Sequence, residues 1–501
     1  MTAGLIPSVM PHLPILQVVV PMLAAPLCFL MRRGTVIWGF TTLVTWAAFA
    51  TSLALLQATL ADGTIRYEIG GWAPPWGIEY VVDATNAAVL VIVSGIAAVV
   101  MPFARRSVEA EIPANQHGLF YTAFLLCLAG LLGVTITGDA FNVFVFLEIS
   151  SLSTYALVAA GAGMDRRALS AAYNYLILGT IGATFFVIGV GMLYMVTGTL
   201  NIVDLSERVP ALQDNRTVHV AFAFLVVGLG LKLAVFPLHT WLPNAYAYAP
   251  SVATAFLAAT STKVSVYVLL RFLFMVFEPN YGFMAMTLDY VLLPLALVAM
   301  VAASVAAIHQ YNIKRLLAYS SVAQLGYIVL GIAYGSVAGL TASILHLFNH
   351  ALIKGALFMA LGCVMLRVGD VTLRGVRGLG RQMPWTMAAF VIGGLSLIGV
   401  PLTVGFISKW HLIVAALGDG RWPIAAVIVG SSLLAVIYVW KVVEAAYLQD
   451  APEGRVVREA PLSMLVPTWV LVLANIWFGV DADFTVEVAR TAAMGLLRVT
   501  P

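Results

Sequence analysis

The residues best suited to chemistry in this chain are four lysines and one glutamate that lie inside long apolar runs. Lys232, Lys263, Lys354 and Lys409 lie deep in such runs, and Glu148 is the only clearly central acid, in FNVFVFLEISSLSTY. A central lysine opposes membrane insertion by about 2.5 to 3.5 kcal/mol, so four oppose it by about 10 to 14 kcal/mol before any pairing. One acid cannot neutralise four ammonium groups. The mismatch predicts that some of these lysines are neutral part of the time and carry protons.

Two histidines extend this pattern through their spacing. His346, His350 and Lys354 lie at i, i+4 and i+8 in HLFNHALIKGALF, which on a helix gives one stripe about 12 Å long. A polar ladder of this kind can hold water and pass protons. Two other interpretations stay open: a haem or metal site made by the histidines, or satisfied core histidines that do not titrate. A metal ion would want a third ligand, and the stripe offers a lysine instead.

Prolines interrupt two of the apolar runs beside an ionisable residue. Pro237 follows Lys232 by five positions in GLGLKLAVFPLHTWLP, and Pro401 precedes Lys409 by eight positions in GGLSLIGVPLTVGFISKW. Proline removes a backbone hydrogen bond, which is tolerated at membrane depth where side chains or water satisfy the freed carbonyl. Broken helices beside ionisable residues mark ion paths in transporters. The likeness of the two segments also hints at an internal duplication.

The elements that position these residues are membrane-spanning helices. Of the 501 residues, 61% are hydrophobic and 10% are charged, against roughly 25% charged in a soluble domain, which excludes a water-soluble fold. Apolar runs bounded by charge, Gly or Pro predict about fourteen spans. Their centres lie near residues 21, 45, 92, 128, 150, 185, 227, 264, 298, 327, 351, 400, 435 and 470. The predicted fold is an all-α polytopic membrane protein with a single transmembrane domain, residues 1–501.

Basic residues in the connections predict the orientation. Lys and Arg are more than twice as frequent in one set of alternate connections, which includes Arg166, Arg167, Lys314 and Arg315, as in the opposite set with both termini. Cytoplasmic loops carry this excess, so an even number of spans with both termini outside fits the asymmetry. The first span lacks the basic residues that precede a signal peptide, which predicts a retained helix. Arg271 and Lys441, near span ends, are expected to snorkel.

The composition also excludes several classes of function. A net charge of +3 with scattered basic residues is too small for a nucleic-acid surface. Cys28, Cys127 and Cys363 each lie alone in an apolar run without CxxC spacing, so we expect no metal centre, cluster or disulfide. The GxG pattern from Gly228 to Gly230 lies in an apolar run, which indicates close helix packing. Polar connections are too short for a nucleotide, haem or flavin domain, so no cofactor is expected.

Five segments resemble the antiporter-like proton-translocating subunits shared by complex I, membrane-bound hydrogenases and the Mrp multi-subunit sodium/proton antiporters. The segments are FNVFVFLEISSLSTYALVA, GLKLAVFPLHTWLPNAYAYAP, STKVSVYVLLRF, NIKRLLAYSSVAQLGYI and FNHALIKGALFM, and the resemblance covers roughly residues 80–450. It implies fourteen helices with two inverted five-helix repeats, each containing a broken helix. The approximate repeats are residues 119–277 and 288–448, with flanking helices in 12–103 and 461–480.

The resemblance also implies an ion pathway along a polar axis in the centre of the membrane. Glu148 resembles the family's acid on the fifth helix, and Lys232 resembles the lysine that pairs with it on the broken seventh helix. The other predicted path residues are His239 after the proline of that break, Lys263 on the eighth helix, His346, His350 and Lys354 on the eleventh, and Lys409 on the broken twelfth.

Several residues favour the Mrp D-type member within this family. Lys409 stands where one complex I subunit typically has an acid, and Asn244 and Tyr246 replace the Asp and His common after WLP in complex I members. The long lateral helix of the largest antiporter-like subunits is not expected. The prediction is therefore a subunit of an Mrp-type monovalent cation (sodium)/proton antiporter in the bacterial cytoplasmic (inner) membrane. Its expected partners are other membrane subunits, lipid, protons and sodium ions.

Three alternatives stay open. The chain could be a proton-pumping subunit of a complex I-type NADH:quinone oxidoreductase or a membrane-bound hydrogenase, with the redox chemistry in other subunits. It could be a membrane enzyme with Glu148 and His350 as acid and base, although the sequence offers no nucleophile or redox centre beside them. It could also be a scaffold whose charges stay fixed. The sequence does not separate sodium from potassium or from protons alone.

Overall fold

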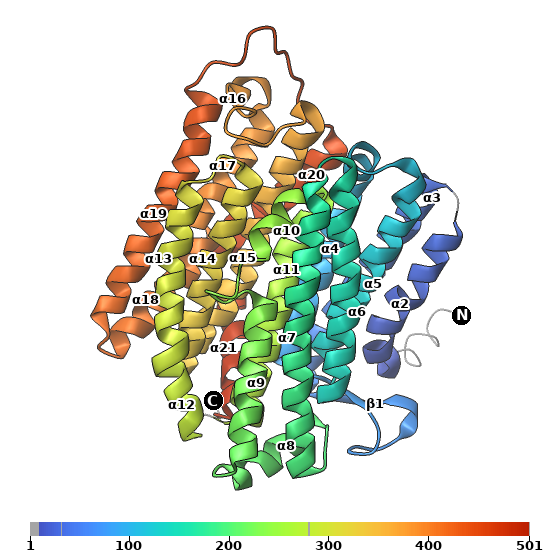
Figure 1. Cartoon of the computed structure of the whole chain (residues 1–501), viewed down its shortest axis with the longest axis vertical. Helices are drawn as coiled ribbons and strands as arrows, with labels where there is room; N and C mark the ends of the chain where they lie inside the picture. Colours follow the sequence, from blue (N-terminus) through green and yellow to red (C-terminus); the bar gives the residue numbers. More distant parts are fainter. Residues whose placement is uncertain (1–9, 32, 279–280, 500–501) are drawn as a thin grey trace.

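Long apolar helices make up nearly all of the structure, a computed structural model that describes residues 10–31, 33–278 and 281–499 (Figure 1). In this part of the chain, 13 helical segments are long and apolar enough to cross a membrane. The shorter apolar helices α17 (Pro384–Ile398) and α18 (Val404–Gly418) follow one another and together provide a further crossing. The predicted all-α polytopic membrane fold with about fourteen spans is therefore confirmed.

The long helices pack side by side along the length of the bundle (Figure 1). They are α2 (Leu13–Leu30), α3 (Gly34–Asp62), α4 (Ala84–Glu111), α5 (His117–Ile136), α6 (Ala140–Ala159), α7 (Arg167–Thr197), α9 (Arg216–Leu233), α11 (Ser251–Leu270), α13 (Leu293–Ile308), α14 (Ile313–Ala333), α15 (Val337–Val368), α19 (Trp422–Tyr447) and α20 (Leu462–Val480).

Short elements complete the bundle. An antiparallel hairpin of β1 (Ile65–Glu68) and β2 (Glu79–Val82) lies at the end opposite α16 (Figure 1). Glu79 of the hairpin is buried and accepts a hydrogen bond of 2.7 Å from the Asn201 side chain, which ties the hairpin to the start of α8. The short helices are α8 (Ile202–Arg208), α10 (Leu242–Tyr248), α12 (Gly282–Thr287), α16 (Leu379–Gln382) and α21 (Asp483–Leu497).

Both predicted helix breaks are present. Helix α9 ends at Leu233, Ala234 adopts a left-handed conformation with φ 61°, and α10 begins eight residues beyond Ala234. Helix α17 ends at Ile398, Gly399 has φ 92°, and α18 begins at Val404. In each case a proline follows the left-handed residue and prevents the helix from continuing. The inverted relation of repeats 119–277 and 288–448 stays a prediction.

Small residues bring neighbouring helices close together. A Cβ placed on Gly228 of α9 would lie 2.7 Å from the Gly182 carbonyl oxygen and 2.7 Å from the Phe186 amide nitrogen of α7. Only glycine permits this approach, because the backbones themselves are in contact. The packing role predicted for the GxG pattern is therefore confirmed.

Three basic residues lie deeper than the sequence predicts. The snorkelling expected of Arg271 is wrong: its side chain is buried at the end of α11 and pairs with Asp83 at 2.5 Å. Asp83 is also the N-cap of α4, so one carboxylate holds two helices. Lys314, predicted in a connection, lies in the first turn of α14 and is buried. Lys441 is half-buried and donates to the Ile308 carbonyl instead of only reaching outward.

Replacing Gly228 tests the close contact between α7 and α9. We expect Gly228→Ala to lower the free energy of unfolding by about 1 to 3 kcal/mol, because the added methyl group overpacks the contact. Gly191→Ala on α7 is the matched control, because its Cβ would meet nothing within 4 Å. Thermal unfolding in detergent measures both variants. Equal melting temperatures for Gly228→Ala and Gly191→Ala would contradict the packing described here.

Candidate functional site

The predicted path residues form a buried row that crosses the bundle from one helix to the next. Lys232 on α9, Lys263 on α11 and Lys409 on α18 are 7%, 0% and 4% exposed, respectively. Helix α11 packs against both α9 and α15, and α15 packs against α18. The row therefore follows the order α9, α11, α15, α18, although these helices lie far apart in the sequence.

The row begins with the predicted ion pair. Lys232 Nζ lies 3.2 Å from Glu148 Oε1 and donates a hydrogen bond of 2.6 Å to Ser151 Oγ, one turn further along α6. Lys232 is in the last turn of α9, where the negative end of the helix dipole favours a cation. The side chain of Lys232 is buried, while that of Glu148 is 23% exposed. Among the described residues, Lys232 is the only one of the four deep lysines within 4 Å of a carboxylate.

The next lysine has only neutral partners. Lys263 Nζ donates to the Ala258 carbonyl and lies 3.5 Å from Thr262 Oγ1, both on its own helix. An ammonium group held only by neutral oxygens is compensated less than one held by a carboxylate. The positive charge of Lys263 is therefore compensated less fully than that of Lys232.

The predicted stripe on α15 is present, and its three members have different surroundings. The His346 ring is fixed at both nitrogens, with Nδ1 2.8 Å from Ser408 Oγ and Nε2 3.0 Å from Gln324 Oε1. The His350 ring is nearly parallel to it, with centroids 6.3 Å apart. Neither ring nitrogen of His350 has a hydrogen-bond partner among the described residues, although the side chain is fully buried. Lys354 Nζ donates to Leu317 O at 2.8 Å and to Ser320 Oγ on α14.

The row ends at the second helix break. Lys409 Nζ lies 3.0 Å from Leu397 O, 2.9 Å from Ile398 O and 3.1 Å from Ser432 Oγ. The first two are carbonyls that the end of α17 leaves without helical partners. The break therefore supplies the acceptors for the lysine, as broken helices do for bound ions in transporters. The ammonium also lies 4.7 Å from the ring centroid of Tyr327.

His239 lies beside the row without bonding to it. Its ring is half-buried in the α9 break, stacks on Phe236 with centroids 5.2 Å apart and contacts Tyr319 edge-on at 6.3 Å. Its Nδ1 atom has no hydrogen-bond partner within the described chain. The structure thus places His239 at the break, as predicted, but in no direct bond with the lysines.

The predicted site residues do not include the hydroxyl and amide groups that hold the row. One signal was available in NIKRLLAYSSVAQLGYI, where Ser320, Gln324 and Tyr327 at i, i+4 and i+7 lie on one face of α14. The other supporting side chains, Ser151, Ser408 and Ser432, lie on helices whose pairing the sequence does not reveal.

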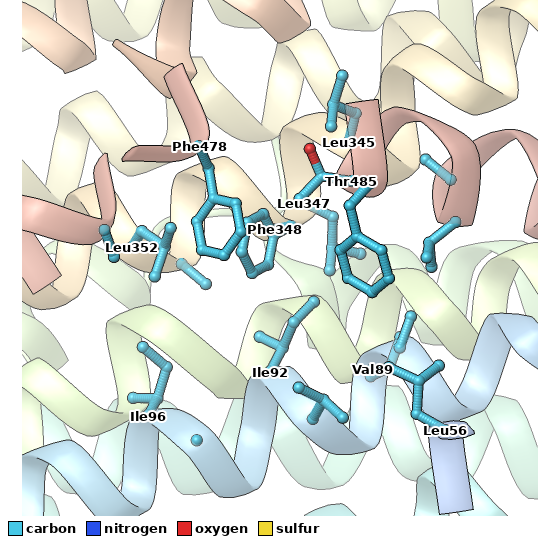
Figure 2. A pocket seen from close by; sticks show the side chains of 18 of the residues that line it. Leu56, Val89, Ile92, Ile96, Leu345, Leu347, Phe348, Leu352, Phe478 and Thr485 are labelled. Carbon is cyan, nitrogen blue, oxygen red and sulfur yellow. The ribbon is translucent and has the colours of Figure 1, made fainter. Parts of the chain in front are cut away.

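The other face of α15 is apolar. Figure 2 shows Leu345, Leu347, Phe348 and Leu352 across from Ile92 of α4, around a groove of about 350 Å³. This groove offers almost no polar atoms, so water and protons are favoured only on the side of α15 that carries His346, His350 and Lys354.

Comparison with known proteins gives the class of this chain. A family model described as NADH:quinone oxidoreductase/Mrp antiporter, TM, matches residues 137–435. NADH-quinone oxidoreductase subunit N of Desulforudis audaxviator is 44% identical over 484 residues, covering 93% of this chain and 95% of that protein. The D-type chain of the Na(+)/H(+) antiporter of Alkalihalophilus pseudofirmus is 29% identical over 437 residues, covering 86% of each chain. A chain of the Mrp complex from Dietzia sp. DQ12-45-1b superposes with a TM-score of 0.89 at 28% identity over 98% of both chains.

A multi-pass helical bundle with these matches is an antiporter-like membrane subunit. The chain belongs to the NADH:quinone oxidoreductase/Mrp antiporter transmembrane family. The family predicted from the sequence is therefore confirmed, and the relatives come from two of the three kinds of complex that the resemblance names, the NADH:quinone oxidoreductases and the Mrp antiporters.

The surroundings of His350 lead to a prediction about water. Buried polar atoms are nearly always hydrogen-bonded, so we expect ordered water at one or both ring nitrogens of His350, bridging toward the neighbouring lysines. His346 is the internal control, because protein groups already occupy both of its nitrogens. An electron cryomicroscopy map at about 2 Å resolution would reveal such waters. A map that shows no ordered water at either ring nitrogen of His350, as at His346, would contradict the expectation.

Proposed function

We propose that this chain translocates protons as a subunit of an Mrp-type monovalent cation (sodium)/proton antiporter. The observation that carries the proposal is the buried row itself, from the Glu148–Lys232 pair through Lys263 and the α15 stripe to Lys409. Buried lysines oppose insertion and folding, and apolar residues would fill these positions at less cost. A row of them is explained if their charges change during transport.

The Glu148–Lys232 pair is the proposed control point. While the carboxylate is 3.2 Å away, it stabilises the charged form of Lys232. When the two groups separate, Lys232 loses this support and releases its proton toward Lys263. The partial exposure of Glu148 suits this role, because a neighbouring subunit can reach it from the outside of α6.

The later steps pass the proton through Lys263, His346, His350 and Lys354 to Lys409. Among the described residues no direct hydrogen bond joins these carriers to one another, so water bridges the gaps. His346 is held in one orientation by Ser408 and Gln324, which suits a relay between the α15 stripe and α18. No covalent chemistry is needed, and the chain acts as a transport subunit and not as an enzyme.

A second candidate parent complex is a complex I-type NADH:quinone oxidoreductase. The 44% identity to a protein named as subunit N of such a complex favours it. The TM-score of 0.89 to a chain of an Mrp complex and the lysine at position 409 favour the antiporter. In both cases the chain lies in the bacterial inner membrane among other membrane subunits, with both termini outside. Protons move along the same row, exchanged for sodium in the antiporter.

Replacing Lys232 tests the row. We expect Lys232→Ala in the assembled complex to lower the rate of proton transport by about 100-fold, because the first carrier and its ion pair are removed. Lys441→Ala is the matched control, because Lys441 is a half-buried lysine that bonds to a backbone carbonyl outside the row. Dye-detected proton flux in inverted vesicles measures the rate, and native gels measure assembly. Lost assembly with normal flux in the residual complex would instead favour a scaffold.

Purification of the tagged chain from its native membrane separates the two parent complexes. We expect small antiporter subunits to co-purify and sodium addition to drive proton flux, because an antiporter couples the two ions directly. Mass spectrometry of the partners and flux assays with sodium or with NADH and quinone provide the measurement. NADH-oxidising partners and sodium-independent flux would assign the chain to a redox pump.

A further inference from the structure

A second polar site lies at the end of the bundle that carries α16, outside the row described above. It is a pocket of about 260 Å³ lined by the last turn of α4, the starts of α7 and α14, and the end of α15. Its lining side chains include Glu111, Asp165, Arg167, Lys314 and Asp370. This end also holds the connections richest in Lys and Arg, which the positive-inside rule assigns to the cytoplasm.

Two charged side chains are buried where the pocket meets the helices. Glu111 is 6% exposed and accepts hydrogen bonds from Ser107 Oγ at 2.6 Å, from Ser251 N at 2.8 Å and from Ser251 Oγ at 3.0 Å. It therefore fixes the start of α11, the helix that carries Lys263. Lys314 is 3% exposed, and its Nζ donates to Ala249 O at 3.2 Å.

Lys314 is the less satisfied of the two. An ammonium group has three donors, and one acceptor is present for Lys314 among the described residues. No carboxylate of the described chain lies within 4 Å of its Nζ. A buried cation with free donors beside a polar pocket of this volume has room for water as its remaining partner.

The first two turns of α14 lead from this pocket to the row. Leu317 O and Ser320 Oγ, three and six positions beyond Lys314, both accept hydrogen bonds from Lys354 Nζ. At 1.5 Å per residue they lie about 5 to 9 Å beyond Lys314 along the helix. The pocket therefore ends within two helical turns of a member of the row.

Acidic and basic side chains share the lining of the pocket. Asp165 pairs with Arg167 at 2.6 Å, and this guanidinium holds the pKa of the Asp165 carboxyl below its usual range. Asp370 also lines the pocket. The carboxylate oxygens of Asp165 and Asp370 can accept hydrogen bonds from pocket water.

We propose that this pocket is the cytoplasmic water entrance of the proton row, and that Lys314 exchanges protons between pocket water and Lys354. In each exchange an N–H bond of Lys314 breaks as the proton passes through water to the neutral amine of Lys354. A proton from pocket water then restores Lys314. Glu111 is a positioning residue that holds the start of α11 at the inner end. The inference rests on the proposed function.

Chemical rescue at position 314 is the test. Cys28, Cys127 and Cys363 are first replaced by Ala, so that Lys314→Cys carries the only thiol of the chain. We expect Lys314→Cys to assemble normally and to lose about 10-fold or more of the proton flux. Aminoethyl methanethiosulfonate attaches a titratable amine of nearly lysine length and should restore at least half of the lost flux. The trimethylammonium reagent attaches a fixed charge and should restore none.

The outcomes separate the entrance from the row. Rescue by the fixed charge, or normal flux in unmodified Lys314→Cys, would overturn the role of Lys314. Lys354→Ala in the same background is the reference: if it loses flux while Lys314→Cys keeps it, the row stands without this entrance. If Lys354→Ala keeps normal flux, the row itself fails.

A second variant tests the pocket if Lys314→Cys does not assemble. Met365→Cys places a thiol on the α15 wall of the pocket, and Thr491→Cys places one in a pocket at the opposite end of the bundle. The membrane-impermeant trimethylammonium reagent, added from the cytoplasmic side, should slow flux through Met365→Cys relative to the same variant without reagent. Thr491→Cys should be unaffected. Equal inhibition of both, or of neither, would overturn the proposed entrance.

Discussion

The burial of positive charge in an apolar bundle is the constraint on which the rest of the structure depends. Lys232 has a carboxylate at 3.2 Å, whereas Lys263, Lys354 and Lys409 have only carbonyl and hydroxyl oxygens. Neutral acceptors compensate an ammonium group less fully than a carboxylate does. The row therefore consists of one strongly compensated position followed by weakly compensated ones. In the proposed function, this difference in compensation suits Lys232 to control and Lys263, Lys354 and Lys409 to proton transfer.

Helix ends provide much of this compensation. Lys232 lies in the last turn of α9, and Lys409 binds the last carbonyls of α17, so both lysines face the negative end of a helix. An unbroken helix would offer no free carbonyls at this depth, because its backbone groups bond to one another. The two breaks are therefore part of the site as well as interruptions of the fold.

Helix α15 divides the interior into a polar side and an apolar side. Its polar face carries His346, His350 and Lys354, while its other face lines an apolar groove against α4 (Figure 2). One continuous helix of 32 residues positions both faces, so a shift of this helix would move the stripe relative to Ser408, Gln324 and Ser320 together. The polar stripe therefore lies away from the apolar groove, which residues of α3 and α20 also line.

The sequence alone determined which segments cross the membrane, where α9 and α17 break, and which side chains share a face of α15, because hydropathy and helical periodicity are local properties. It also carried the family motifs around Glu148 and Lys232. Only the tertiary structure decided which neutral oxygens hold each lysine, that Arg271 pairs with Asp83, and that Lys314 is buried beside a pocket. These partners lie on helices distant in sequence. Their choice depends on how glycine contacts and side-chain volumes set the distances between helices, which no local pattern encodes.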